Sequence, residues 1–469
     1  MIARSAFCLI LAFGVANTMH AQKIDRTKAP ETPPLPAFKL PPVFETKLPN
    51  GLQVVLVEDH RFPLVTARLA FLAGSRFDPP DLAGLSESAG ALLRDGTQTR
   101  TSRQIAEELA SIGGSLTAQS SRDALTVSAN SLAEQAPRLL DLIADVARNA
   151  TFPAEEVQLR VQNRRQSLLL QRSRADFQGE LKLNEVLYGS HPYARIAPTP
   201  ESIGRLDTAK LAAFRDQFLV PNNAVLIVLG QLPPRAELLS VIRQKFGDWK
   251  QKDLPAPPTA PLPEIKRTLL LVDRPGSVQA DIRVGRLAVT RTSPEYFPLL
   301  MGNAVLGSGG SSRLFLDIRE KRGYAYDAHS ILDAQKDAGA FVAVTQVRNE
   351  VVEPALEALL DDLSGMAKAP VGNSELTDFK NFLSGFFVMR LESQNGLASQ
   401  LALVKAMGLP NDYLETYTTR IRSTEPDQIL AASKKYISPE QAAIVVVGDA
   451  QKIGPALEKI GKFEVTKVE

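Results

Sequence analysis

Two stretches far apart in the chain share one pattern of apolar and polar positions. Residues 218–230 and 436–448 each finish an amphipathic helix, turn at a proline, continue as an apolar run and stop at a glycine. An apolar run of this length between proline and glycine predicts a buried strand. A further helix is expected after each glycine, near 235–246 and 452–460. Because order and spacing agree on both sides, the pattern indicates an ancient duplication.

Strands and amphipathic helices also alternate within the first half. Residues 44–57 hold an Asn-Gly step between two apolar segments, which predicts a β-hairpin. Residues 104–112 have apolar positions at helical spacing and lead to a Gly-Gly stop, whereas residues 125–129 alternate as a strand does. We therefore expect an α+β fold of two homologous halves, each an α/β sandwich in which helices cover a mixed sheet.

Two proline-rich segments mark the boundaries of these halves. Residues 22–42 cannot bury much apolar surface and are expected to form an extended N-terminal arm. Residues 250–264 divide the chain near its middle and are predicted to be a linker. The predicted domains are thus 43–249 and 265–469.

The first 21 residues have the pattern of a secretory signal peptide. A short basic region precedes an apolar run that is too short to span a membrane, and small polar residues lead to a cleavage site near Ala21. This pattern predicts an exported soluble protein, periplasmic in a Gram-negative source. Cys8, the only cysteine, lies inside the predicted signal, so the mature chain would have no disulfide or thiol chemistry.

Composition changes this picture little. The chain of 469 residues is 44% apolar and 23% charged, which is ordinary for a globular protein. Its net charge of +2 gives no electrostatic reason to expect nucleic acid as a partner. No segment after the predicted signal is long and apolar enough to predict a membrane span.

Short motifs follow one another in a characteristic order between residues 43 and 465. They are Asn50-Gly51-Leu52, Gly74-Ser75-Arg76, Arg94–Thr97, Gly113–Ala118, His191-Pro192-Tyr193 and, most strongly, Leu306–Phe315 continuing to Ile318–Tyr326. In this order they resemble the pitrilysin/insulinase type of zinc peptidase, the inverzincins. The resemblance implies two homologous α+β halves that close on a peptide like a clamshell.

The zinc motif of that family, His-x-x-Glu-His on a helix, is absent. When the chain is aligned on the preceding Gly-Leu, the three motif positions hold Glu87, Gly90 and Ala91. Two histidines four residues apart would share one helix face and bind zinc, and the glutamate would act as the base. The family's third ligand, a glutamate on a later helix, is also missing, because residues 157–179 contain no glutamate.

No other metal site is predicted in this chain. The histidines of the mature chain are His60, His191 and His329, which are far apart in sequence and have no partner at ligand spacing. The predicted helix 154–174 instead carries Arg160, Arg164, Arg165, Arg172 and Arg174. These arginines are expected to form a solvated face. The alternative is that one or two fill the vacated metal region or meet an acidic partner, while Glu87 is expected to be a polar residue on a partly exposed helix.

Arg319 and Tyr326 are the candidate catalytic and substrate-binding residues. The family has an Arg and a Tyr seven residues apart that bind the peptide and help stabilise the tetrahedral intermediate, and this pair matches that spacing. Residues 312–322 are predicted to be helical, with Gly323 as the stop and a strand after it. Without the resemblance, Arg319 would be interpreted as a solvated charge and Tyr326 as a packed aromatic.

Gly309 and Gly310 lie in a glycine-serine loop just before that predicted helix. The loop lacks the Lys-Ser/Thr ending of a phosphate-binding P-loop. A hinge or a close approach of its backbone to the substrate is the interpretation we favour, so both glycines are candidate substrate-binding positions.

The resemblance leads to one main hypothesis about function. Some members of the family work as pairs in which one subunit keeps the zinc motif and the other keeps the Arg/Tyr pair. This chain is expected to be the non-catalytic subunit of an exported heterodimeric peptidase, with no cofactor of its own and with zinc in a homologous partner subunit. The alternative is a peptide-binding or assembly scaffold without a role in catalysis. A self-sufficient hydrolase has the least support, because no His is placed near a Ser or Asp in a recognisable arrangement.

Overall fold

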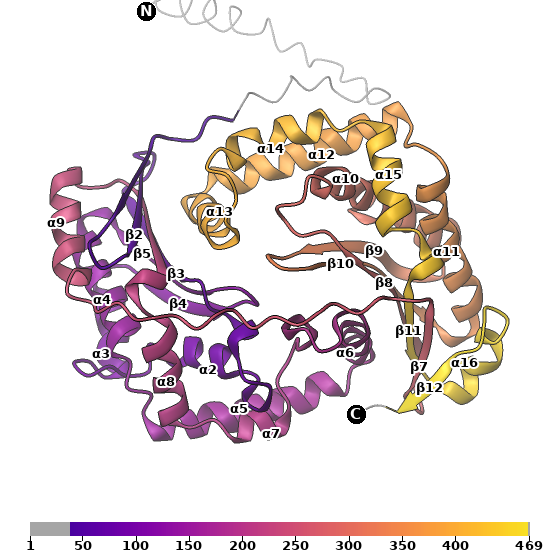
Figure 1. Cartoon of the computed structure of the whole chain (residues 1–469), viewed down its shortest axis with the longest axis horizontal. Helices are drawn as coiled ribbons and strands as arrows, with labels where there is room; N and C mark the ends of the chain where they lie inside the picture. The colour runs from indigo at the N-terminus through magenta and orange to yellow at the C-terminus, as the bar shows by residue number, and fades with distance from the viewer. Residues whose placement is uncertain (1–37, 468–469) are drawn as a thin grey trace, which may run out of the picture. The chain divides into compact units, whose positions relative to one another are not determined.

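Two six-stranded mixed sheets form the framework of the protein (Figure 1). The computed structural model describes residues 38–467, so the predicted signal peptide and most of the predicted arm lie outside the described residues. The N-terminal sheet has the order β1-β2-β6-β3-β5-β4. Its strands are β1 Val43–Lys47, β2 Gln53–Glu58, β3 Leu64–Phe71, β4 Ser115–Ser120, β5 Leu125–Leu132 and β6 Ala224–Gly230.

The C-terminal sheet repeats this topology, with the order β12-β7-β11-β8-β10-β9. In the N-terminal sheet β6 pairs parallel with β2 and antiparallel with β3. In the C-terminal sheet β11 pairs in the same way with β7 and β8. The edge position held by β1 is taken by β12, which pairs parallel with β7 rather than antiparallel. The strands are β7 Thr268–Asp273, β8 Gln279–Ala288, β9 Ala325–Ala334, β10 Gly339–Arg348, β11 Ala443–Gly448 and β12 Glu464–Lys467. The predicted fold of two homologous halves is confirmed.

Helices cover both sheets and alternate with the strands along the chain. Those of the first half are α2 Leu85–Leu92, α3 Ser102–Ser111, α4 Ala136–Asn149, α5 Ala154–Arg172, α6 Ala175–Tyr188, α7 Pro200–Gly204, α8 Thr208–Phe218 and α9 Arg235–Phe246. Those of the second half are α10 Tyr296–Gly307, the π-helix η6 Phe315–Lys321, α11 Val352–Lys368, α12 Asn373–Glu392, α13 Gln394–Met407, α14 Tyr413–Arg422, α15 Pro426–Tyr436 and α16 Ala450–Leu457. Residues 250–264, the predicted linker, have no regular secondary structure.

Local sequence signals explain several of these boundaries. Helix α3 begins at a capping box in which Thr101 accepts from the backbone N–H of Gln104 while the Gln104 side chain accepts from Thr101. The predicted hairpin joins β1 to β2 through Gly51, whose φ of 89° lies in the left-handed region that only glycine enters without strain.

Each half covers one face of the other half's sheet with a helix. Helix α6 belongs to the first half but packs on β8 and β11, whereas α13 belongs to the second half but packs on β3 and β6. Figure 1 shows α13 next to β3 and α6 next to the C-terminal strands. Buried residues of α6, such as Leu183 and Leu187, join Val445 and Val447 of β11 in one apolar cluster. Since each buried aliphatic side chain contributes about 1.5–3 kcal/mol, this exchange binds the halves firmly.

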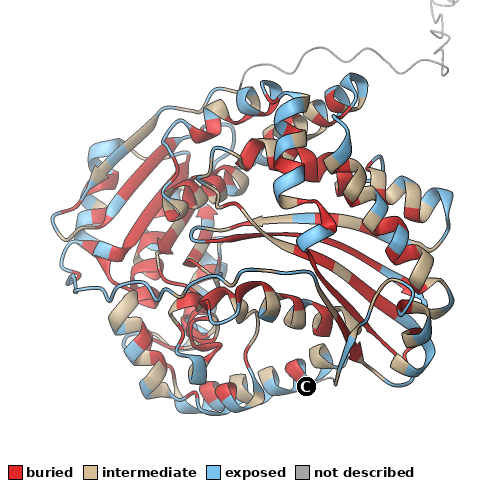
Figure 2. Cartoon of the chain, turned by 45° about the vertical axis from the view of Figure 1, so that its right-hand side comes forward, coloured by how far each residue is buried: buried red, intermediate tan, exposed pale blue. Residues whose placement is uncertain are grey.

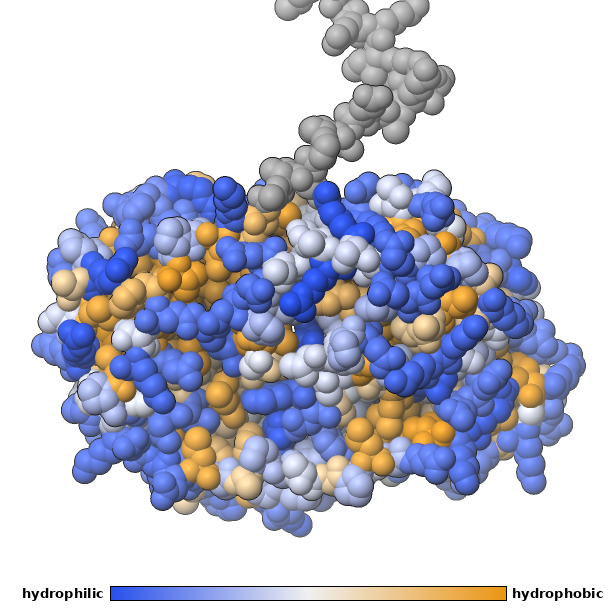
Figure 3. Space-filling model, turned by 45° about the horizontal axis from the view of Figure 1, so that its top comes forward, coloured by the Kyte–Doolittle hydropathy of each residue, from blue (hydrophilic) through white to orange (hydrophobic). Residues whose placement is uncertain are grey.

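Burial follows the layers. In Figure 2 the strands are mostly red, while the helices are red toward a sheet and blue toward solvent. On the face shown in Figure 3, hydrophobic and hydrophilic residues are interspersed. Within residues 38–467, no helix combines the length and the hydropathy that crossing a membrane requires.

A buried ion network joins the two halves where the turns of their equivalent hairpins meet. Arg76, only 5% exposed, pairs with Asp123 of the β4–β5 turn through Nη1 at 3.1 Å, and with Asp337 of the β9–β10 turn through Nη2. The hydroxyl of Tyr193 donates to Asp123 at 2.6 Å. Tyr193 belongs to the His-Pro-Tyr motif of the sequence, so that motif has a structural role at the contact between the halves.

Candidate functional site

Helix α2 carries the three positions where the family's zinc motif would stand. The carboxylate of Asp78 anchors the start of the helix, because the N–H groups of Gly84 and Ser86 both donate to it at 3.0 Å. Burial raises the pKa of Asp78 to about 7, and these hydrogen bonds oppose the rise. At Gly90, a Cβ atom would lie 3.4 Å from Leu125 of β5, so a larger side chain there would meet a packed neighbour.

Two arginines of α5 reach Glu87 on α2. Arg160 donates to its carboxylate at 2.8 Å through Nη2, and Arg164 approaches it at 3.1 Å through Nε. The expectation that the arginines of this helix form only a solvated face is therefore wrong for these two, and Glu87 is more than a solvated polar residue. The sequence contains the five arginines, but a pair formed across 73 positions could not be identified from it.

The residues at this position do not fit a zinc ion. Zinc sites use neutral imidazole, thiolate and carboxylate ligands arranged around one point. Here the carboxylate of Glu87 is already shared by two guanidinium cations. Among residues 38–467, no group of three or more His, Cys, Asp or Glu side chains is arranged to hold a metal ion.

Arg319 and Tyr326 lie together on the second half. The guanidinium carbon of Arg319 lies 4.8 Å from the centre of the Tyr326 ring and 4.6 Å from that of Phe315, so the guanidinium stacks on both rings. Arg319 Nε also lies 3.3 Å from a carboxylate oxygen of Glu320. Tyr326 is 85% exposed and therefore is not a packed core aromatic. The arrangement presents a phenol and a planar donor group toward solvent.

The backbone around this pair is irregular at two points. Arg319 lies on η6, which is a π-helix ending where Gly323 adopts a φ of 64°. Tyr326 lies in a β-bulge. Thr345 of β10 pairs with Ala328 and Val347 pairs with Ala325, so β9 has one more residue than β10 between these two pairs. A bulge changes the direction in which a strand side chain points, and the side chain of Tyr326 at this bulge points outward.

The glycine loop lies next to the Arg/Tyr pair. Gly310 faces Phe315, whose ring would lie 3.7 Å from a Cβ atom at that position, and Phe315 in turn stacks on Arg319. Gly309 has a φ of 85° and faces Phe382 of α12. The structure thus brings all four predicted site residues into one neighbourhood. Whether they bind a substrate stays a prediction.

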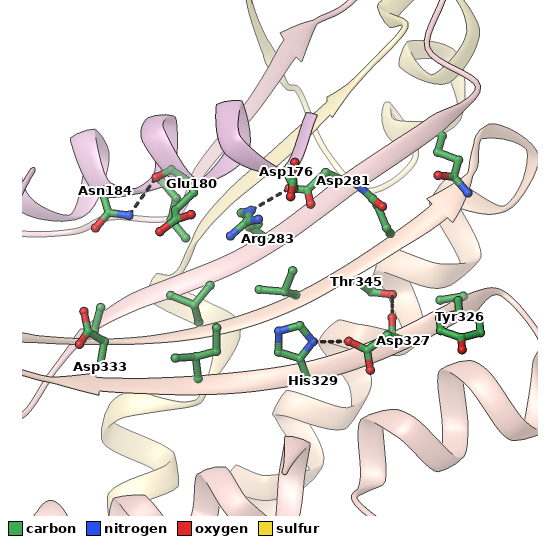
Figure 4. Close-up of a pocket in the computed structure, with 18 of the residues that line it drawn as sticks. Asp176, Glu180, Asn184, Asp281, Arg283, Tyr326, Asp327, His329, Asp333 and Thr345 are labelled. Carbon is green, nitrogen blue, oxygen red and sulfur yellow. Dashed lines mark hydrogen bonds and ion pairs between the residues drawn. The ribbon is translucent and has the colours of Figure 1, made fainter. Parts of the chain in front are cut away.

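A cavity begins at Tyr326 and runs along β9. It has a volume of about 900 Å³ and lies between α6 and the strands β8, β10 and β9 (Figure 4). Asp281 and Arg283 pair at 2.7 Å on one wall, and burial raises the pKa of Asp281 to about 6. On the other wall, His329 Nδ1 lies 2.7 Å from Asp327. Because β9 is the edge of its sheet, its outer backbone groups face no further strand.

A carboxylate behind η6 gives a pH-dependent contribution to stability. Burial and the neighbouring Asp317 raise the pKa of Asp362 of α11 from 3.8 to about 6, and its Oδ2 atom is buried without a hydrogen bond. Between these two values the unfolded chain has lost this proton while the folded chain keeps it, so stability falls as pH rises. Above pH about 6 the full cost is present.

The variant Asp362→Asn is expected to remove this cost. The side chain is partly exposed, so we expect only about 1 kcal/mol more unfolding free energy at pH about 8 and little change at pH about 4. Urea denaturation at both pH values measures this. The exposed Glu357 of the same helix provides the control, since Glu357→Gln should change neither value. Equal effects of Asp362→Asn at both pH values would contradict the assignment.

Sequence models of one peptidase family match both halves of the chain. The model described as "Insulinase (Peptidase family M16)" matches residues 53–193, and the model described as "Peptidase M16 inactive domain" matches residues 205–383. The first match contains α2 and its Glu87, and the second contains Arg319 and Tyr326.

Curated bacterial proteins are similar over most of their length. An uncharacterized zinc protease of Mycobacterium leprae is 27% identical over 366 residues, which cover 76% of this chain and 81% of the relative. One from Mycobacterium tuberculosis is 26% identical over 425 residues, 88% of this chain and 95% of the relative. Another, from Bacillus subtilis, is 25% identical over 352 residues, 75% of this chain and 85% of the relative.

Solved structures share the fold. A crystal structure of a peptidase M16 inactive domain from Pseudomonas fluorescens is 26% identical, with a TM-score of 0.81 over 87% of this chain and 98% of that one. A protease from Helicobacter pylori, 19% identical, has a TM-score of 0.79 over 87% of this chain and 100% of that one. These similarities agree with the α+β halves, and two such domains fit the expected clamshell-like arrangement.

Proposed function

Since the chain belongs to the insulinase family of peptidases, M16, we propose that it is the non-catalytic subunit of an exported zinc metallopeptidase heterodimer. In this proposal a homologous partner subunit with an intact His-x-x-Glu-His motif holds the zinc. This chain binds part of the peptide substrate and supplies Arg319 and Tyr326 to the shared active centre.

The observation that carries the proposal is the outward position of the Arg319–Tyr326 pair. An aromatic side chain that is 85% exposed contributes little to its own fold. Among residues 38–467, the stacked guanidinium beside it makes one ion pair, with the neighbouring Glu320. Both groups donate hydrogen bonds, and a planar guanidinium held between two rings is already oriented. Such donors suit a peptide carbonyl oxygen on which negative charge develops.

The pairing of Glu87 with Arg160 and Arg164 supports the proposal that the partner subunit, and not this chain, holds the zinc. Those three side chains replace the zinc ligands on α2 and α5 with an ion cluster that joins the same two helices. The first half therefore keeps its architecture without the groups that hydrolysis would need, and the chemistry would have to come from a second chain.

The edge strand β9 supports peptide binding. A peptide in extended conformation can add to a free sheet edge through backbone hydrogen bonds, and the cavity beside β9 would then receive alternate side chains. Gly309 and Gly310 leave the loop before η6 without side chains, so a backbone could approach it closely.

The purified chain alone is expected to bind no stoichiometric zinc and to cleave no peptide, because the ligands and the base are absent. Peptide hydrolysis should appear when the homologous subunit with the intact motif is added, and the mixture should elute as one complex of both chains. Metal analysis, size-exclusion chromatography and a peptidase assay measure these outcomes. About one tightly bound zinc per isolated chain would contradict the proposal, and a complex whose activity does not depend on this chain would favour the scaffold alternative.

A further inference from the structure

A second cavity lies in the C-terminal half, away from Arg319 and Tyr326. It has a volume of about 650 Å³ and is bounded by the start of α10, the α13–α14 loop and the α14–α15 turn. Cavities of this size are typical of small-ligand sites. Arg291 and Arg420 both line this cavity, and none of the described residues that line it is Asp or Glu. The lining is therefore positively charged, with apolar walls that include Phe297 and Leu409.

Arg291 is held in place but its charge is not neutralised by a carboxylate. Its Nε donates to the hydroxyl of Tyr413 at 3.2 Å, and its guanidinium carbon lies 4.7 Å from the centre of the Tyr296 ring. Within residues 38–467 no salt bridge of Arg291 is present, and the hydrogen bonds of its side chain are limited to the one with Tyr413. Two guanidinium nitrogens thus remain for a ligand in the cavity.

The first half contains the equivalent of this site, and there a carboxylate completes it. The backbone N–H of Arg76 donates to Arg122 in the β4–β5 turn, and that of Arg291 donates to Gln335 in the equivalent β9–β10 turn, both at 3.1 Å. Arg76 pairs with Asp123, which also accepts from the hydroxyl of Tyr193.

The carboxylate is what the second half lacks. Arg291 corresponds to Arg76 through the backbone contact with the equivalent turn, and Tyr413 follows α13 as Tyr193 follows α6, so it takes the place of Tyr193. Lys336 follows Gln335 where Asp123 follows Arg122, and the next residue, Asp337, is paired with Arg76 of the other half. Asp123 and Asp337 therefore both pair with Arg76.

We infer that the cavity at Arg291 binds a ligand carboxylate attached to an apolar group. The ligand carboxylate takes the part that Asp123 plays at Arg76, because a guanidinium fork and a carboxylate make two parallel hydrogen bonds. Arg420, which lies over Phe297 at 5.6 Å, adds a second cation, and the aromatic walls receive the apolar group. This inference does not depend on the proposed function.

Calorimetric titration of the full chain with hydrocinnamate tests it, with hydrocinnamyl alcohol as the uncharged analogue. Saturable binding of the acid is expected, at least about tenfold tighter than of the alcohol. Arg291→Lys and Arg420→Ala should each weaken it about tenfold, because they remove the fork and the second cation. Arg422→Ala is the matched control, since Arg422 is on the same helix but does not line the cavity.

A gain-of-carboxylate variant keeps the test valid if Arg291→Lys fails to fold. Ser293 lines the cavity, and its hydroxyl accepts from the N–H of Glu295, which an aspartate also can do. Ser293→Asp should raise the melting temperature and abolish hydrocinnamate binding, because Arg291 then has an internal partner.

A short peptide ending in phenylalanine identifies the source of the carboxylate. Binding of the free-acid peptide but not of its amide supports a peptide C-terminus as ligand, and binding of hydrocinnamate alone supports a free organic acid. Equal binding of acid and alcohol, tighter binding of inorganic phosphate, or unchanged affinity in Arg420→Ala and Ser293→Asp would overturn the inference.

Discussion

Replacing Tyr326 by Phe is expected to lower the turnover of the reconstituted heterodimer about 100- to 1000-fold, which is the usual effect of losing one donor to a developing oxyanion. The substitution removes only a hydroxyl from a ring that is 85% exposed, so the melting temperature and the pairing of subunits should not change. Arg319→Ala should have a similar effect, and Arg319→Lys should not restore activity because an ammonium group cannot reproduce the planar fork.

The control for this prediction is Arg322→Ala. Arg322 lies three positions from Arg319 and pairs with Asp317, but it has no assigned role toward substrate. The assay is peptide hydrolysis at saturating substrate, with thermal melting measured in parallel. Full activity in both Tyr326→Phe and Arg319→Ala would show that the pair is structural, and the scaffold interpretation would then be preferred.

Replacing Arg76 by Met is expected to destabilise the chain by about 3–5 kcal/mol, because the change leaves the carboxylates of Asp123 and Asp337 without their shared cation. Asp123 is itself buried, so water cannot replace the lost partner there. Urea denaturation followed by tryptophan fluorescence and circular dichroism measures the loss, and both signals should shift together.

Arg103→Met is the comparison for this second prediction. Arg103 pairs with Glu107 on the surface of α3, where both side chains are exposed, and such a pair contributes less than about 1 kcal/mol. The double variant Arg76→Met/Asp123→Asn should recover part of the loss, since it also removes one unpaired charge. Equal, small effects of Arg76→Met and Arg103→Met would mean that the network between the halves contributes little.

The sequence allowed several elements, and the repeat of their order in the two halves, to be predicted, because those depend on local patterns. The Asn-Gly hairpin, the Pro-to-Gly apolar strands and the helices after them are set by residues within a few positions of one another. No local pattern indicated that α6 and α13 pack on the other half's sheet. The periodicity of apolar residues shows which face of a helix is apolar, but not which surface that face packs against.

The candidate site was predictable only in part, for the same reason. The spacing of Arg319 and Tyr326 could be identified from the resemblance to the family. Their exposure depends on a π-helix and a bulge, which arise from the register between strands and from packing against α11. The pairing of Glu87 with Arg160 and Arg164 needs helices that are distant in sequence to come together, so no local pattern could distinguish it from a solvated charged face.

The exchange of α6 and α13 has a consequence for how the chain acquires its fold during synthesis. Val225 and Ile227 of β6 belong to the same apolar core as Leu397 and Leu401 of α13. When the first half has left the ribosome, that face of its sheet has no cover until residues 394–407 follow. The N-terminal half is therefore complete in sequence long before it is complete in structure, and in that interval an apolar sheet face is open to wrong partners. For the same reason, a cut in the segment 250–264 would sever the backbone without releasing either half.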